Sequence, residues 1–133
     1  MLDRIDICVE APPVRYEELT MERRGEGSRA IRQRVSRAQA IQQERYRNTR
    51  FRFNADLDME AVKRFCRLDG AQQKLMQETY ERLELTARAY CRILKVARTI
   101  ADLDEAERIG EEHLSEAICY RALDKKYWNG AER

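Results

Sequence analysis

The sequence predicts an all-α fold, a small bundle of four to five helices preceded by a single N-terminal strand. Only 5 Gly and 2 Pro occur among the 133 residues, so few positions interrupt a helix. Apolar residues recur at helical spacing through most of the chain. Charged residues make up 38% of the sequence, enough to cover the outer faces of such helices. The length suits one domain with one modest core.

The first fourteen residues, "MLDRIDICVEAPPV", have the pattern of a strand. Ile5, Ile7 and Val9 recur with a period of two, which is typical of a half-buried strand, and a Pro-Pro pair ends the pattern. A single strand leaves its backbone groups unpaired, so it needs partner strands. We therefore expect residues 1–14 to form one orphan strand, in a piece cut from a larger protein.

Residues 15–27 are charged and contain two glycines, which is typical of a linker or exposed loop. Ser28 then suits a helix N-cap. Beyond it, apolar or small residues at helical spacing are Ile31, Val35, Ala38 and Ile41 or Gln42. This pattern predicts a long amphipathic helix to about Tyr46, with an arginine-rich outer face.

Two short helices are expected next, each with one apolar stripe. Asp58 suits the N-cap of a helix that ends near Cys66. Asp69 and Gln72 then have the spacing of a capping box, which predicts a third helix over residues 70–83.

Two further helices complete the predicted bundle. Thr86 suits the N-cap of a fourth helix over residues 87–103, and a fifth is expected over residues 111–123. Residues 124–133 have no periodic pattern and are expected to form a flexible tail. The helical domain is therefore predicted to span residues 28–123.

The chain offers little chemistry of its own. It has no GxxxxGK[ST] phosphate loop, no GxGxxG, no HExxH and no GxSxG. The four cysteines form no CxxC pair and are expected to be reduced and mostly buried. His113, the only histidine, stands at a helix start beside two glutamates, so we expect a surface or helix-start histidine and no metal site. The chain alone is predicted not to be an enzyme.

The location is expected to be cytoplasmic. No apolar run approaches the roughly 20 residues of a membrane span. The N-terminus lacks the basic and then apolar pattern of a signal peptide. We therefore expect no membrane partner.

The predicted fourth helix, "LTARAYCRILKVARTI", separates charge from apolar surface. At about 100° per residue, one side carries Arg88, Arg92, Lys95 and Arg98, and the other carries Tyr90, Ile93, Leu94, Ala97, Ile100 and Ala101. A cation in the first turn opposes the helix dipole by a few tenths of a kcal/mol. Arg88 therefore fits best beside an anion such as a phosphate. The other three cations are expected to form a solvated or core-facing rim with no assigned chemistry.

These residues also carry a resemblance to a known family. "LTARAYCRILKVARTIADL" (residues 85–103) resembles the C-terminal helical lid of magnesium-chelatase-like AAA+ ATPases, most closely the ComM-like members. "LDRIDICVE" resembles the last strand of the AAA+ core, and "EEHLSEAICYR" resembles the final lid helix. The resemblance covers residues 2–121. It implies that the orphan strand is left over from the core and that the helices form the lid.

The resemblance also implies roles for two arginines. Arg88 matches the sensor-2 arginine that contacts nucleotide phosphates, and Arg4 matches the arginine finger that reaches the nucleotide of a neighbouring subunit. ATP and Mg²⁺ are then cofactors of the full-length parent, with none bound by this chain alone. The implied partners are the chain's own AAA+ core and the neighbouring subunits of a ring oligomer.

The sequence departs from the family pattern at three positions. Thr86 replaces a serine but can cap equally well, and Cys91 replaces a frequent histidine, so any role of that histidine is lost. Glu84 stands where a small or glycine-like turn residue is common, and is expected to strain the turn.

Two other functions stay open. Residues 29–55 hold eight arginines and one acid, Glu44, which gives +7 in a chain of net charge +2. Such a segment can bind DNA as a basic helical nucleic-acid-binding module, with Arg29, Arg32, Arg37 and Arg45 as candidate contacts. Its aromatics, Tyr46, Phe51 and Phe53, either stack on bases or pack between helices. The remaining alternative is a helical bundle that binds proteins.

Overall fold

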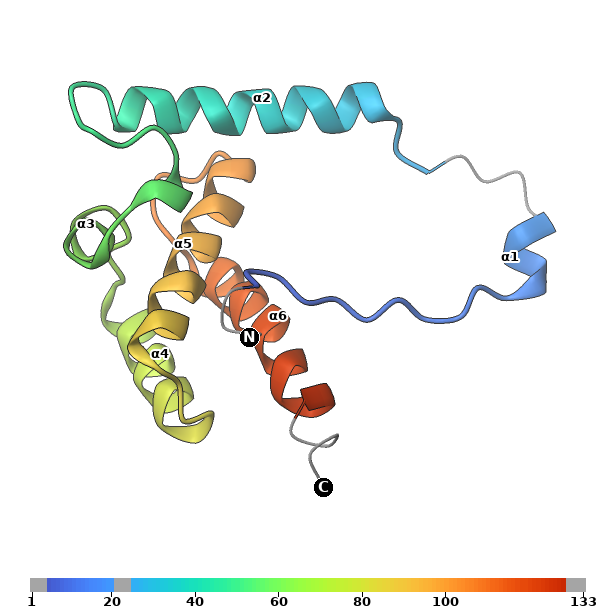
Figure 1. Ribbon diagram of the computed structural model, residues 1–133. Helices are drawn as coiled ribbons and strands as arrows, with labels where there is room; N and C mark the ends of the chain where they lie inside the picture. Colours follow the sequence, from blue (N-terminus) through green and yellow to red (C-terminus); the bar gives the residue numbers. More distant parts are fainter. Residues whose placement is uncertain (1–4, 21–24, 129–133) are drawn as a thin grey trace.

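The structure, a computed structural model, describes residues 5–20 and 25–128, with side chains as far as residue 122. Within these ranges it is helical and contains no strand (Figure 1). The α-helices are α1 (Tyr16–Thr20), α2 (Ser28–Arg45), α3 (Met59–Phe65), α4 (Gly70–Arg82), α5 (Ala87–Leu103) and α6 (Glu111–Trp128), with a 3-10 turn, η2 (Asn54–Asp56). The predicted all-α class is therefore confirmed.

The predicted N-terminal strand is wrong for the described residues. Residues 5–14 have no regular structure, and Ile5, Ile7 and Val9 are 42%, 49% and 68% exposed. No strand in the described ranges lies beside them, and an unpaired strand gains no ladder hydrogen bonds. The segment instead reaches α5 and α6 and then leads to α1, a short helix inside the predicted linker.

Helix α2 forms where the sequence predicts it, but only its C-terminal half is supported. Ala38 and Gln42 are buried, whereas Val35 and Ile31, about one and two turns before Ala38 on the same stripe, are 41% and 42% exposed. Figure 1 shows the N-terminal half of α2 extending beyond the bundle formed by α3 to α6. The inward-facing stripe is thus confirmed near the bundle and not at Ile31 and Val35.

The predicted helix caps have mixed outcomes. The side chain of Asp58 accepts a hydrogen bond from the Ala61 N–H at 2.8 Å, and Thr86 accepts one from the Ala89 N–H at 3.1 Å, so these two predicted N-caps are confirmed. The predicted N-cap at Ser28 is wrong, because Ser28 is the first residue of α2 and Gly27 is the N-cap. The capping box at Asp69 is wrong, because its side chain makes no capping bond. The Gln72 Oε1 atom is buried without a hydrogen-bond partner in the described part of the chain.

Helix α5 lies at the centre of the core. Its predicted apolar side is confirmed, since Ile93 and Leu94 are 1% and 2% exposed and Ala97 and Ala101 are fully buried. It packs against α6, α2, α3 and η2. The core also contains Tyr46, whose ring stands edge-on to Phe65 at 5.0 Å and to Phe51 at 6.3 Å.

A buried carboxylate, Asp102, joins three elements. Both of its oxygens accept from the Arg45 guanidinium of α2, at 2.9 and 2.5 Å. One oxygen also accepts from Asn54 Nδ2 of η2 at 2.9 Å, and the other from Arg98 Nε of α5 at 3.2 Å. Burial raises the pKa of the nearby Tyr46 to about 12, so its phenol stays protonated and donates to Asn54 Oδ1. These bonds fix the C-terminal end of α2 on the bundle.

Two helices end in a residue with left-handed backbone. Glu84 follows α4 with φ of 50°, and Glu105 follows α5 with φ of 55°. After α4, the Leu85 N–H donates to the Tyr80 carbonyl at 3.1 Å and the Glu84 N–H to the Glu81 carbonyl at 3.3 Å, a Schellman motif. The expected strain at Glu84 is therefore confirmed, because glycine is the residue that adopts this conformation at low cost.

Helix α6 begins where the sequence predicts and continues to Trp128, five residues past the predicted end at residue 123. Residues 129–133, the remainder of the expected tail, lie outside the described ranges. None of the described helices combines the length and apolar content that a bilayer span requires.

Substitution of Glu84 by glycine is expected to stabilise the chain by about 1 kcal/mol, because it removes the left-handed strain after α4. The measurement is the free energy of unfolding from urea titration. Glu78→Gly, at an exposed interior position of the same helix, is the matched control and should destabilise by about 1 kcal/mol. Equal destabilisation by both substitutions would contradict the inference that the Glu84 backbone is strained.

Substitution of Asp102 by alanine is expected to destabilise the chain by about 3–5 kcal/mol, because it leaves the Arg98 and Arg45 guanidinium groups without their buried carboxylate. Urea titration measures the loss. Glu81→Gln removes an exposed carboxylate from α4 and should change stability by less than about 0.5 kcal/mol.

Candidate functional site

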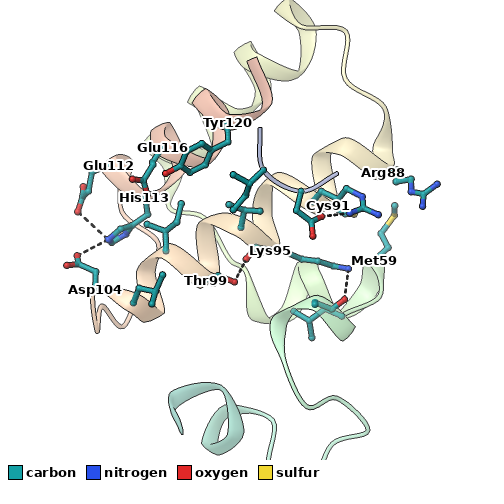
Figure 2. A pocket seen from close by; sticks show the side chains of 18 residues that line it. Met59, Arg88, Cys91, Lys95, Thr99, Asp104, Glu112, His113, Glu116 and Tyr120 are labelled. Carbon is teal, nitrogen blue, oxygen red and sulfur yellow. Dashed lines mark hydrogen bonds and ion pairs between the residues drawn. The ribbon is translucent and has the colours of Figure 1, made fainter. Parts of the chain in front are cut away.

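A groove of about 1110 Å³ runs along α5. One wall comes from η2 and the start of α3, and the other comes from α6 and the N-terminal residues Asp6 and Ile7. Figure 2 shows Arg88 and Lys95 toward one end and Asp104, Glu112 and His113 at the other. The groove therefore has an apolar floor, with cations near one end and carboxylates near the opposite end.

The four cations of α5 have different surroundings. Arg92 pairs with Asp6, and Lys95 donates to the Ala55 carbonyl at 3.3 Å. Arg88 is exposed in the first turn and lines the groove, and no ion pair or hydrogen bond engages it within the described part of the chain. Arg88 is thus the α5 cation whose guanidinium has no acceptor among the described residues.

Arg98 faces the core, which is the second of the two alternatives, solvated or core-facing, that the sequence left open for this residue. It is 5% exposed and donates through Nη1 to the Glu107 carbonyl at 3.0 Å and through Nη2 to the Ala106 carbonyl at 2.8 Å. Those carbonyls follow the end of α5, so Arg98 fastens the loop to α6 while it neutralises Asp102. A detectable signal existed, because Arg98 and Asp102 are four residues apart, which is the spacing of an ion pair on one face of a helix.

The N-terminal segment is held by two arginines that the sequence did not single out. Arg121 of α6 is 6% exposed and donates through Nη1 to the Ile5 carbonyl at 2.7 Å. Arg92 of α5 pairs with the carboxylate of Asp6. Arg121 shares one face of α6 with Leu114 and Ile118, so a cation on an apolar stripe was the available signal.

His113 lies at the start of α6, so the helix-start alternative is confirmed and the surface alternative is not, since the residue is 4% exposed. Its Nδ1 accepts from the Gly110 N–H at 2.9 Å, so the neutral ring carries its proton on Nε2. Nε2 then donates to Asp104 Oδ2 at 2.9 Å. The imidazole caps a free N–H at the helix start and ties it to the end of α5, which explains its burial.

Asp104, Glu112 and His113 also bring three potential metal-ligand atoms within 4.8 Å of one another. A metal on Nε2 would have to displace the proton that Nε2 carries while Nδ1 accepts from Gly110. Two of the three side chains are exposed carboxylates, which are common without an ion. The hydrogen bonds thus account for the cluster as a helix cap.

The basic segment is less available than its charge suggests. Arg29, Arg32 and Arg37 are exposed on α2, but Arg45 has its guanidinium bound to Asp102. Tyr46 is buried, so its ring packs between helices in the core and is not exposed for stacking on bases. Arg4 lies outside the described residues.

The cysteines are unpaired, but only two of the four are buried. Cys66 and Cys91 are buried, Cys8 is partly exposed and Cys119 is exposed. Burial raises the pKa of the Cys66 thiol to about 12, so this thiol resists ionisation near neutral pH. Cys91 contributes to the groove wall where the family resemblance implies a histidine.

Comparisons with known proteins place the chain in a family. A family model described as the C-terminal part of magnesium chelatase, subunit ChlI, matches residues 25–121. The uncharacterized protein YifB of Escherichia coli is 39% identical over 126 residues, which cover 93% of this chain and 24% of that protein. The competence protein ComM of Haemophilus influenzae is 38% identical over 123 residues, which cover 92% of this chain and 23% of that protein.

A more distant relative, an uncharacterized protein of Mycobacterium bovis, is 29% identical over 121 residues, which cover 24% of its length. The chain thus spans about a quarter of the length of the curated relatives that it matches. The family match covers α2 to α6, including every helix that lines the groove. The chain belongs to the family of the magnesium chelatase subunit ChlI C-terminal domain, with ComM and YifB among its relatives.

Proposed function

We propose that this chain is the C-terminal helical lid of a AAA+ ATPase and that Arg88 contacts the phosphates of a bound nucleotide as a sensor-2 arginine. ATP and Mg²⁺ would be bound by the remainder of the full-length protein, because this sequence contains no phosphate-binding loop. The proposed partners are that core and the neighbouring subunits of a ring. The chain alone is then not catalytic.

The state of Arg88 carries this proposal. Arg92, Lys95 and Arg98 all have acceptors within the chain, whereas none engages Arg88 in the described residues. An arginine in the first turn, beside the positive end of the helix dipole, is locally unfavourable. A phosphate removes that disadvantage, because both the guanidinium and the dipole attract it.

The position of Arg88 suits a phosphate contact from outside the chain. The α5 N-cap is fixed by Thr86 and the helix by its buried apolar side, so the Arg88 backbone is held in place. Its side chain stays exposed at one end of the groove (Figure 2). A planar guanidinium on a fixed backbone can bind two phosphate oxygens at once.

Substitution of Arg88 by alanine in the full-length protein is expected to lower ATP turnover on the order of 10-fold or more, because one phosphate donor is lost. Steady-state ATP hydrolysis gives kcat and KM, and binding of a fluorescent ATP analogue gives the affinity. The unfolding free energy should stay within about 0.5 kcal/mol of the parent, because the side chain is exposed.

Arg32→Ala is the matched control, since Arg32 is an exposed arginine near the start of another helix. Basal turnover without nucleic acid should be unchanged by this substitution. Unchanged turnover in the Arg88→Ala protein, with an intact fold, would contradict the sensor-2 role.

A second candidate, binding of nucleic acid, is favoured by one observation. The N-terminal half of α2 extends beyond the bundle, and Arg29, Arg32 and Arg37 on it have no ion-pair partner in the described residues (Figure 1). Arg45 is not part of this surface, because Asp102 binds it. The role as a protein-binding bundle stays a prediction, as does the cytoplasmic location.

Replacement of Arg29, Arg32 and Arg37 together by alanine is expected to weaken duplex DNA binding and to reduce the log–log salt slope by about 3, because each arginine releases about one counterion. Fluorescence anisotropy over a salt series measures both. Alanine at the exposed Lys63, Arg67 and Arg82 is the control with equal charge loss. No binding by the parent chain at low salt would remove this candidate.

A further inference from the structure

We propose that Arg92 and Arg121 are positioning residues, which fix the entering segment, residues 5–7, to the lid so that both move as one body. This inference rests on the proposed function where it concerns ATP turnover. The entering segment is the chain that leads into the lid, and in the sequence it directly follows Arg4. A rigid attachment would couple a nucleotide contact at Arg88 to that segment.

The two contacts act on adjacent residues from two different helices. Arg121, buried in α6, donates to the main-chain carbonyl of Ile5 at 2.7 Å. Arg92, on the groove face of α5, binds the side chain of Asp6. One anchor therefore holds the backbone whatever the side chain, and the other selects an acidic residue. Two anchors on neighbouring residues fix the direction of the segment as well as its position.

Apolar burial contributes little to this attachment. Ile5 and Ile7 are 42% and 49% exposed, and farther along Val9 is 68% exposed. Side chains buried only to this extent gain only part of the free energy that full burial gives. The polar contacts to Arg92 and Arg121 are therefore the interactions expected to decide whether the segment stays on the bundle.

Arg92 is placed to link the segment with Arg88. The two arginines are four residues apart on α5, so they are neighbours on one face of the helix. Both line the same groove, as do Asp6 and Ile7. If α5 shifts when Arg88 binds a phosphate, Arg92 would therefore shift with it, and Asp6 would follow through its ion pair with Arg92.

A nitroxide spin label on Cys8 tests the attachment directly. In a Cys119→Ser background, Cys8 is the remaining described thiol that is not buried. Burial raises the pKa of Cys66 to about 12 and protects that thiol during labelling. Arg92→Ala and Asp6→Asn should each increase label mobility. The double substitution Asp6→Arg with Arg92→Asp should restore the parent mobility, because the pair is rebuilt with reversed charges.

Lys95→Ala is the matched control, because Lys95 is an α5 cation of the same groove that contacts Ala55 instead of the entering segment. Its label mobility should equal that of the parent. Unchanged mobility in Arg92→Ala, or an equal increase in Lys95→Ala, would overturn the attachment. Hydrogen exchange of the residue 5–10 amides gives the same comparison without a label.

The coupling is tested in the full-length protein by ATP hydrolysis. Arg92→Ala is expected to lower kcat about 3-fold or more with KM for ATP unchanged, because the residue positions a segment and does not bind the nucleotide. The charge-reversed pair should recover turnover, which a merely stabilising contact elsewhere would not explain. Increased label mobility with unchanged kcat would overturn the coupling. If Arg88→Ala leaves turnover unchanged, the proposed function fails, and label mobility alone still decides the attachment.

Discussion

The carboxylate of Asp102 is the constraint on which the fold most depends. A fully buried charge is costly unless it is paired and hydrogen-bonded, so its partners must converge on it. Arg45 comes from α2, Asn54 from η2 and Arg98 from α5 itself. The convergence of these partners on the carboxylate therefore also sets where the long helix crosses the bundle. Helix α2 buries little apolar surface of its own, so this polar junction determines its position more than hydrophobic contact does.

The same helix that supplies Asp102 also connects the remaining parts of the molecule. Its inward side forms the core, its C-terminal loop is fastened by Arg98, and its outward side lines the groove. Asp104, just past its end, accepts a hydrogen bond from the imidazole Nε2 of His113 at the start of α6. If α5 moves when Arg88 binds a nucleotide, as proposed, the polar contacts of α5 would move α2, α6 and the entering segment with it.

Local signals in the sequence predicted the local features well. The caps at Asp58 and Thr86 and the strained turn at Glu84 depend on residues only a few positions apart, and all three were predictable. Two local signals failed, because Gly27 and not Ser28 is the N-cap of α2, and the Asp69 side chain makes no capping bond. The other failures depended on distant residues. The strand pattern at residues 5–14 is real, but a strand requires partners that the described chain does not provide. The burial of His113 depends on its acceptor Asp104, which lies past the end of another helix. The contacts of Arg98 and Arg121 reach backbone carbonyls outside their own helices.

The unsupported half of α2 has a mechanical consequence. About ten residues of this helix precede its first buried position, Ala38, which corresponds to roughly 15 Å of helix at 1.5 Å per residue. The junction at Asp102 clamps the other end, so the free part behaves as a lever arm. A rotation of the bundle by about 10° would then move the tip of this arm, which is roughly 15 Å long, through roughly 3 Å. A small rotation of the bundle is thereby converted into a displacement of the helix tip that is large enough to make or break contacts with a neighbouring domain or polymer.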